Sequence, residues 1–149
     1  MISNHNNKIN VTFCGMMGSG KTVVGRKLAN EIGFNFIDTD KIIEEKSGKS
    51  IGTIFEEKGE KYFRDLEREI ICKILKKEKH VISLGGGSII DNTIRKIIKK
   101  NSFNIYLNVK IDILCKRLSK SKNRPLILNT EIDKKLSKLL KEREKFYKQ

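Results

Sequence analysis

The chain has 149 residues, of which 38% are hydrophobic and 34% are charged, without a low-complexity tract or a shift in composition along its length. This composition predicts one globular domain over residues 1–149 and argues against a two-domain enzyme and against global disorder. No run of about eighteen apolar residues is present, and the first residues lack the charged-then-apolar order of a signal peptide. We therefore expect a cytoplasmic protein whose residues 1–8 form a disordered tail.

The formal net charge of +14 raises nucleic acid as a partner, because clustered lysines and arginines neutralise phosphates. The lysines are instead spread over most of the predicted helices, often beside glutamates, as in residues 76–79 and 141–144. That arrangement is typical of solvated helix faces, so we expect no specific nucleic-acid partner. The cysteines Cys14, Cys72 and Cys115 are widely spaced and predict neither a disulfide framework nor a zinc site; we expect them to be small buried hydrophobes.

Apolar runs and helical spacings alternate along the chain. Short buried strands are predicted at residues 9–14, 34–37, 81–84 and 103–109. Helices are predicted at residues 21–32, 40–46, 51–57, 60–77, 92–100, 111–119 and 131–148, with breaks around Gly48 and Gly59. Strands that alternate with helices predict an α/β fold, in which a parallel sheet is covered by helices on both faces.

The strongest single motif is Gly15-Met16-Met17-Gly18-Ser19-Gly20-Lys21-Thr22, which matches GxxxxGK[ST] between a predicted strand and a predicted helix. Gly15, Gly18, Ser19 and Gly20 let the backbone wrap a phosphate, Lys21 reaches the β- and γ-phosphates, and Thr22 offers a hydroxyl to Mg²⁺. The motif predicts a P-loop NTPase fold that binds ATP or GTP. It does not identify the acceptor, although the short chain favours a small-molecule or nucleotide kinase over a motor.

Two carboxylates, Asp38 and Asp40, follow the second predicted strand at the edge where ligands of α/β sheets collect. Residues two apart in an extended segment share a face, so both carboxylates are predicted to point into one cleft. By itself the pair leaves an alternative open, in which Asp40 caps the helix that follows.

Further motifs follow in a fixed order. They are Ser50-Ile51…Ile54-Phe55, Gly59-Glu60…Phe63-Arg64…Glu67, Gly85-Gly86-Gly87, Arg124-Pro125-Leu126 and Arg143…Tyr147. Together with the P-loop motif and the acidic pair, this ordered set resembles shikimate kinase over about residues 10–147. The resemblance implies a three-layer P-loop kinase that transfers the γ-phosphate of MgATP to the 3-hydroxyl of shikimate, in the pathway to chorismate and the aromatic amino acids.

The resemblance also implies roles for individual residues. Lys21 and Arg124 would neutralise the charge on the transferred phosphoryl group, because the transition state of phosphoryl transfer is loose and its charge lies on phosphate oxygens. Asp38 would hold a water of the magnesium shell, together with Thr22. Asp40 would bind the acceptor hydroxyl and receive its proton. Residues 120–128 would form a lid that closes over ATP and excludes water.

The acceptor is expected to lie among the arginines and the triple glycine. Arg64, oriented by Glu67, and Arg143 would bind the carboxylate of shikimate. Gly85, Gly86 and Gly87 would let the ring approach the backbone and accept an N–H hydrogen bond. An ordinary i,i+3 ion pair between Arg64 and Glu67, and a plain flexible turn at the glycines, are the competing interpretations.

Arg117 occupies the position at which the family stacks a basic side chain on adenine, and a solvated arginine at a helix end is the alternative. Family members continue beyond the Arg-x-x-x-Tyr motif into one more strand and a terminal helix. Since the sequence ends at Gln149, we expect those elements to be missing, with an uncovered sheet edge and one wall of the adenine site absent. A monomer is expected.

Two rival functions stay open from the residues alone. One is another P-loop small-molecule kinase, acting on gluconate or on a nucleotide, which would keep Lys21 and Thr22 and choose another acceptor. The other is a non-catalytic basic module that binds a nucleotide or nucleic acid. The pair Arg64 and Arg143 with the triple glycine argues against the first rival, and the scattered lysines argue against the second.

Overall fold

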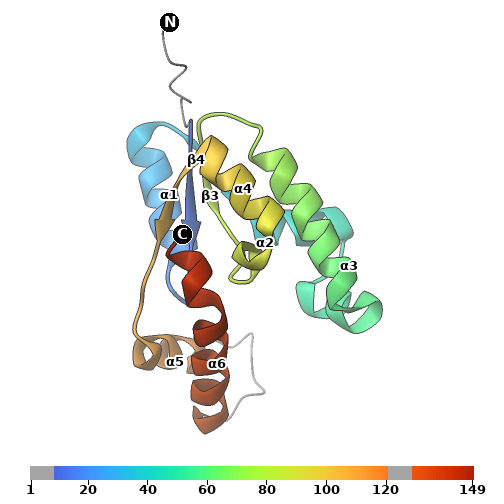
Figure 1. Cartoon of the computed structure of the whole chain (residues 1–149), viewed down its shortest axis with the longest axis vertical. Helices are drawn as coiled ribbons and strands as arrows, with labels where there is room; N and C mark the ends of the chain where they lie inside the picture. The colour runs from blue at the N-terminus through green and yellow to red at the C-terminus, as the bar shows by residue number, and fades with distance from the viewer. Residues whose placement is uncertain (1–8, 121–128) are drawn as a thin grey trace, which may run out of the picture.

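The computed structural model describes residues 9–120 and 129–149. Its sheet contains the parallel strands β1 (Asn10–Cys14), β2 (Asn35–Asp38), β3 (His80–Ser83) and β4 (Ser102–Tyr106) in the order β2-β3-β1-β4. The register pairs Val11 with Val81 and Phe103, and Phe36 with Val81. The parallel sheet with flanking helices confirms the predicted α/β architecture, as Figure 1 shows.

Helices connect the strands and also follow the last strand, β4. They are α1 (Lys21–Ile32), α2 (Thr39–Ser47), α3 (Ile51–Ile74), the short 3₁₀ helix η1 (Ser88–Ile90), α4 (Asn92–Asn101), α5 (Ile111–Ser119) and α6 (Asn129–Tyr147). The bounds of α1 and α5 coincide with the predicted ones. Gly59, with φ 81° and ψ 169°, interrupts α3 at the predicted break, because glycine adopts positive φ without steric cost.

The sheet separates two apolar clusters. On one face, Phe13, Ala29 and Val81 form a small core under α1. On the other face, a larger core gathers isoleucines of α3 and α4 with Cys14 and Leu114. Figure 1 shows α1 on one side of the sheet and α3 and α4 on the other. This division follows from the alternation of side chains along a strand, which sends neighbouring residues of β1 to opposite faces.

Strand β4 forms one edge of the sheet. Its Phe103 and Ile105 are 59% and 38% exposed. Both lie on the same face of the sheet as α1, but α1 packs against β1 and β3 and leaves this part of β4 open.

Some expectations differ from the structure in detail. The long helix ends at Ile74 rather than at residue 77, and β4 ends at Tyr106 rather than at residue 109. Cys14 is buried as predicted, but Cys72 and Cys115 are only partly buried, and Cys115 packs against the margin of the larger core. Among the described residues, no helix combines the length and the apolar character that crossing a bilayer requires.

The parallel arrangement brings the carboxyl ends of the strands to one edge of the sheet, where ligands of open α/β sheets bind. β1 leads into the P-loop, β2 ends at Asp38, and β3 leads into the triple glycine. Helix α6 packs against α5 and η1, so it reaches the same end of the molecule. The fold thereby collects the predicted site residues from segments far apart in the sequence.

Candidate active site

The P-loop forms a tight turn between β1 and α1. Gly15, Gly18 and Gly20 all have positive φ, at 143°, 79° and 95°. A Cβ on Gly15 would lie 2.8 Å from the carbonyl oxygen of Leu107, so no other residue fits there. Ser19 is buried, and its hydroxyl has no hydrogen-bond partner among the described residues. The loop therefore presents a backbone cradle with an unused polar group at the N-terminus of α1.

Lys21 lies at the start of α1 and is 9% exposed. Its Nζ donates to the carbonyl oxygens of Gly15 and Met16, at 2.9 Å each. Burial lowers the pKa of Lys21, and the nearby carboxylates of Asp40 and Asp38 oppose that shift. Because its hydrogen bonds within residues 9–120 and 129–149 go to neutral carbonyls of the loop, the ammonium is available to an anion bound there.

A cavity of about 500 Å³ adjoins this loop, lined by residues 18–24 and Arg117. Arg117 donates from Nη1 to the carbonyl oxygen of Gly18 at 3.0 Å. Its guanidinium thus lies at the predicted nucleotide site and holds the P-loop, an interaction that the sequence did not indicate. Whether Arg117 stacks on adenine stays a prediction. Arg124 and residues 121–128 of the predicted lid lie outside the described residues.

Asp38 contacts Thr22 and Asp40 lies against Gly85, but the two carboxylates do not belong to one extended segment as predicted. Asp38 is the last residue of β2 and the N-cap of α2, where its Oδ1 accepts from the backbone N–H groups of Asp40 and Lys41 at 3.2 and 3.4 Å. Asp40 lies in the first turn of the helix. The alternative that Asp40 caps this helix is therefore wrong, since Asp38 makes those bonds.

The other oxygen of Asp38 accepts a hydrogen bond from the Thr22 hydroxyl at 2.7 Å. A hydroxyl and a carboxylate oxygen beside a phosphate-binding loop are the hard ligands that Mg²⁺ accepts, since Mg²⁺ keeps several waters and takes one or two protein ligands plus phosphate oxygens. The two side chains therefore fit a magnesium ion that would also contact a bound nucleotide. No cluster of three or more acidic, histidine or cysteine side chains that could hold a metal occurs among residues 9–120 and 129–149.

Asp40 has an unusual electrostatic environment. Its pKa is raised from 3.8 to about 6, chiefly by burial and also by the negative charges of Asp38 and Glu67, while Lys21 acts in the opposite direction. A carboxylate whose pKa approaches the working pH is suited to accept a proton during reaction.

Each glycine of the triple glycine adjoins a different charged side chain. A Cβ on Gly85 would lie 2.6 Å from Oδ1 of Asp40, and one on Gly87 would lie 2.6 Å from Nη2 of Arg64. A Cβ on Gly86 would lie 3.6 Å from Nη1 of Arg143. At Gly85 and Gly87 a side chain would collide with these charged groups, which argues against a plain flexible turn, whereas at Gly86 it would make an ordinary van der Waals contact.

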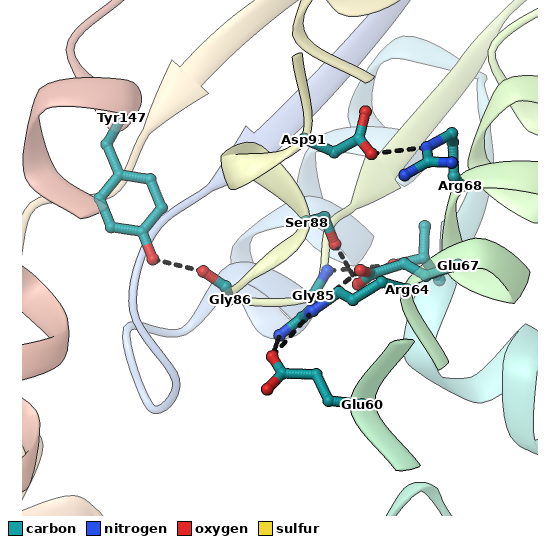
Figure 2. Close-up of polar contacts among 10 residues, drawn as sticks. Glu60, Arg64, Glu67, Arg68, Gly85, Gly86, Ser88, Asp91 and Tyr147 are labelled. Carbon is teal, nitrogen blue, oxygen red and sulfur yellow. Dashed lines mark hydrogen bonds and ion pairs between the residues drawn. The ribbon is translucent and has the colours of Figure 1, made fainter. Parts of the chain in front are cut away.

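Arg64 and Glu67 form the predicted pair, with Nη1 of Arg64 donating to Oε2 of Glu67 at 2.7 Å. Glu67 is 1% exposed, and its Oε1 accepts from the Ser88 hydroxyl at 2.6 Å. On its outer side Arg64 also contacts Glu60 at 3.4 Å. Figure 2 shows this chain of contacts running from Glu60 through Arg64 and Glu67 to Ser88. The guanidinium is held by a buried carboxylate, unlike that of an exposed helix pair.

Arg143 reaches the site from α6. It is 8% exposed, and its Nε lacks a hydrogen-bond partner in the described part of the chain. A buried guanidinium N–H without an acceptor carries a large desolvation cost, which an anionic ligand would offset. Arg64 and Arg143 therefore flank the triple glycine from two helices that are distant in the sequence.

The sequence interpretation missed two residues that connect these parts. Thr39, 0% exposed, accepts through Oγ1 from the backbone N–H of Gly85 at 3.0 Å, so it joins the acidic segment to the glycines. Ser88, also 0% exposed, supports Glu67. Thr39 lies between the two acids and Ser88 directly follows the glycines, and these positions were the signals that the sequence offered. Their hydrogen-bond partners could not be identified from the sequence, because they lie 46 and 21 residues away.

The geometry agrees with comparisons to known proteins. The family model described as SKI: Shikimate kinase matches residues 17–149. A shikimate kinase of Caldanaerobacter subterraneus subsp. tengcongensis is 41% identical over 139 residues, which cover 93% of this chain and 81% of that protein. A shikimate kinase of Zymomonas mobilis is 38% identical over 137 residues, covering 92% of this chain and 78% of the relative.

Solved structures agree. The shikimate kinase of Acinetobacter baumannii in complex with shikimate superposes with a TM-score of 0.88 at 36% identity, covering 96% of this chain and 80% of that one. The shikimate kinase of Bacteroides thetaiotaomicron gives 0.90 at 33% identity, with 94% and 82% coverage. A gluconokinase of Sinorhizobium meliloti gives 0.58 at 17% identity, a likeness of fold alone. The chain belongs to the shikimate kinase family.

Proposed function

We propose that this chain transfers the γ-phosphate of ATP to the 3-hydroxyl of shikimate, giving shikimate 3-phosphate and ADP. The observation that carries the proposal is the arrangement of two arginines and one carboxylate around three consecutive glycines, next to the P-loop. Arg64, Arg143 and Asp40 each lie against one of these glycines. Shikimate is a small carboxylate with three hydroxyls, and guanidinium groups are the side chains best suited to bind its carboxylate.

The nucleotide would bind at the P-loop. The backbone of residues 15–20 and the N-terminus of α1 would hold the β- and γ-phosphates, with the Ser19 hydroxyl as a further donor. Lys21 would exchange its bonds to the carbonyl oxygens of Gly15 and Met16 for bonds to phosphate oxygens. Arg117, which lines the adjoining cavity, and Arg124 of the lid would contribute further positive charge.

Magnesium is the proposed metal cofactor, held by the Thr22 hydroxyl and, through a water, by Asp38. When bound, it would neutralise negative charge on the phosphates of the nucleotide. The 2.7 Å contact between Thr22 and Asp38 supports this assignment, because both oxygens already converge on one point.

Asp40 would bind the 3-hydroxyl of shikimate and take its proton as the oxygen attacks the γ-phosphorus. The raised pKa of Asp40, about 6, supports this role, because the carboxylate is ionised near neutral pH and yet has an appreciable proton affinity. Lys21 would stabilise the charge on the transferred group. Arg64 and Arg143 would hold the carboxylate of shikimate, and Glu67 would keep Arg64 in place.

We propose that residues 1–149 form one kinase domain and that residues 120–128 form its lid. We also propose that the protein is a monomer and that it acts in the cytoplasm, where ATP is available. Gel filtration with light scattering tests the monomer, and trypsin digestion with and without nucleotide tests the lid, since lid closure would protect Lys120 and the basic residues after it. A dimer, or cleavage of the lid that nucleotide does not slow, would contradict these assignments.

The function is tested by ADP release from MgATP, with and without shikimate. Gluconate and nucleoside monophosphates serve as alternative acceptors, and EDTA tests the metal requirement. We expect ADP release that depends on shikimate and Mg²⁺, with shikimate 3-phosphate identified by mass spectrometry. Stimulation by gluconate or a nucleotide in place of shikimate would overturn the assignment of the acceptor.

A further inference from the structure

Tyr147, the last residue of α6, is a buried side chain that the proposed mechanism does not use. It is 2% exposed, and its hydroxyl donates to the carbonyl oxygen of Gly86 at 2.5 Å, as Figure 2 shows. The same hydroxyl lies 3.6 Å from Sδ of Met16 in the P-loop. One phenol group therefore contacts both the triple glycine and the phosphate-binding loop.

The bond to Gly86 sets the orientation of one peptide unit. The described chain contains no cis peptide bonds, and in a trans peptide the C=O and the following N–H point in opposite directions. Because the Gly86 carbonyl points to Tyr147, the Gly87 N–H of the same unit points away from Tyr147. Gly87 itself lies against the Arg64 guanidinium. With glycine on both sides, this peptide has no side chain of its own to limit its rotation.

We propose that Tyr147 is a positioning residue that orients the Gly86–Gly87 peptide, so that the Gly87 N–H serves as a hydrogen-bond donor to the bound acceptor. The inference rests on the proposed function, because the acceptor is taken to lie against the triple glycine. It adds a role for the tyrosine of the Arg-x-x-x-Tyr motif, which acts through the backbone and not through contact with the substrate.

Two further observations support the assignment. Burial raises the pKa of Tyr147 to about 12, against the effect of the Arg143 charge, so the hydroxyl stays protonated and donates at any pH at which the protein works. The ring stacks on Tyr106 with centroids 5.0 Å apart and 18° between the planes. The stacking fixes the direction of the hydroxyl, and α6 carries Arg143 one turn earlier to the same glycines.

The stacked pair supplies a matched control. Tyr147→Phe removes the hydroxyl and keeps the ring, the stacking and the packing. Tyr106→Phe makes the same chemical change in the partner ring, but the Tyr106 hydroxyl donates to the exposed Asn108 side chain at 3.4 Å rather than to a residue of the P-loop or the triple glycine. A general effect of losing a phenol in this cluster would appear in both variants. An effect through Gly86, or through Arg143, which also hydrogen-bonds to the Tyr147 side chain, would appear only in Tyr147→Phe, and the amide signal of Gly87 distinguishes these two.

The first readout is the amide signal of Gly87 in a ¹H–¹⁵N correlation spectrum without ligands, because a hydrogen bond to a carbonyl oxygen shifts the amide nitrogen of the same peptide. We expect this signal to move in Tyr147→Phe and to stay in place in Tyr106→Phe. The second readout is binding by calorimetry. A neutral hydrogen bond contributes up to about tenfold in affinity, so we expect shikimate to bind about three- to tenfold more weakly to Tyr147→Phe, with the affinity for ATP unchanged.

An unmoved Gly87 amide, or a shikimate affinity equal to that of the wild type, would overturn the inference. Failure of the proposed function is a separate result, because it would appear as a wild-type protein that releases no ADP on addition of shikimate. If Tyr147→Phe does not fold, 3-fluorotyrosine at position 147 keeps the test. Its hydroxyl is a stronger donor, so we expect the Gly87 amide to move in the opposite sense, and an unmoved signal would again contradict the proposal.

Discussion

The guanidinium of Arg64 donates to the carboxylate of Glu67 at 2.7 Å, and the Glu67 side chain is only 2% exposed. An i,i+3 pair on a helix surface contributes a few tenths of a kcal/mol. A buried carboxylate is different, because its desolvation offsets much of the Coulombic gain. The pair is therefore better explained by the fixed position that it gives to Arg64 than by stability, and Ser88 on the other carboxylate oxygen adds to that rigidity.

Arg64→Ala should weaken the binding of shikimate by about 10- to 100-fold, because a hydrogen bond between charged groups contributes about 1.5–3 kcal/mol. The affinity for ATP should not change, since Arg64 does not line the cavity beside the P-loop. Calorimetry with each ligand measures both affinities. Arg68→Ala, one turn later on α3 and paired with Asp91, is the matched control and should bind shikimate normally. Equal losses in the two variants would contradict the role of Arg64.

Lys21→Ala should lower kcat by at least about 10²–10³-fold, the range that follows removal of one group that stabilises a charged transition state. The fold should persist with some loss of stability, because the substitution leaves the buried carbonyl oxygens of Gly15 and Met16 without this donor but removes no core side chain. Steady-state ADP release and a thermal unfolding curve measure the two effects. Lys27→Ala, an exposed position on the same helix, should leave both unchanged. Turnover in Lys21→Ala close to that of the wild type would contradict the phosphate-binding role.

Asp40→Asn should reduce kcat by about 10²–10⁴-fold and change the affinity for shikimate far less, since the amide keeps the shape and cannot take a proton. In the wild type, log(kcat/KM) should fall below about pH 6, where Asp40 becomes protonated. Equal losses in kcat and in affinity would make Asp40 a binding residue only.

Asp40→Asn should lower activity but raise the stability of the folded protein. Because the pKa of Asp40 is raised in the folded protein, the folded state holds a proton that the unfolded state releases, and the free energy of unfolding decreases as the pH rises from about 4 to 6. Asp40→Asn removes this penalty, so it should be more stable than the wild type by about 1–3 kcal/mol at pH 8, with no gain at pH 4. Urea unfolding at the two pH values measures the difference, and a gain of equal size at both would rule out the ionisation as its cause.

Gly85→Ala should impair both folding stability and turnover, because the added Cβ would lie 2.6 Å from Asp40, 3.0 Å from Glu67 and 3.0 Å from Ser88. Gly52→Ala is the matched control. It lies near the start of α3, where a Cβ meets nothing closer than 3.8 Å, so it should raise the free energy of unfolding by about 0.5–1 kcal/mol. Denaturant unfolding and ADP release measure both variants. A Gly85→Ala protein with normal turnover would show that Asp40 and Glu67 tolerate displacement.

Local chemistry made part of the site predictable. The groups that hold a phosphate come from consecutive residues 15–22, and their geometry follows from the positive φ of the glycines and the start of α1. Apolar periodicity likewise gave the strands and helices to within a few residues, because period 2 and period 3.6 are properties of the segment itself. The roles of Arg64 and Arg143 rested instead on a resemblance of ordered motifs.

Tertiary structure decided how these segments meet. Strand order β2-β3-β1-β4 is invisible in the sequence, yet it puts Thr39 against Gly85 and the P-loop beside the triple glycine. The expectation that Asp38 and Asp40 share an extended segment was wrong, because the helix starts at Thr39 and Asp38 is needed to cap it. The bond from Tyr147 to Gly86 spans 61 residues. Propensity and periodicity act over a few residues, whereas such contacts depend on how the packed sheet and helices bring distant segments together.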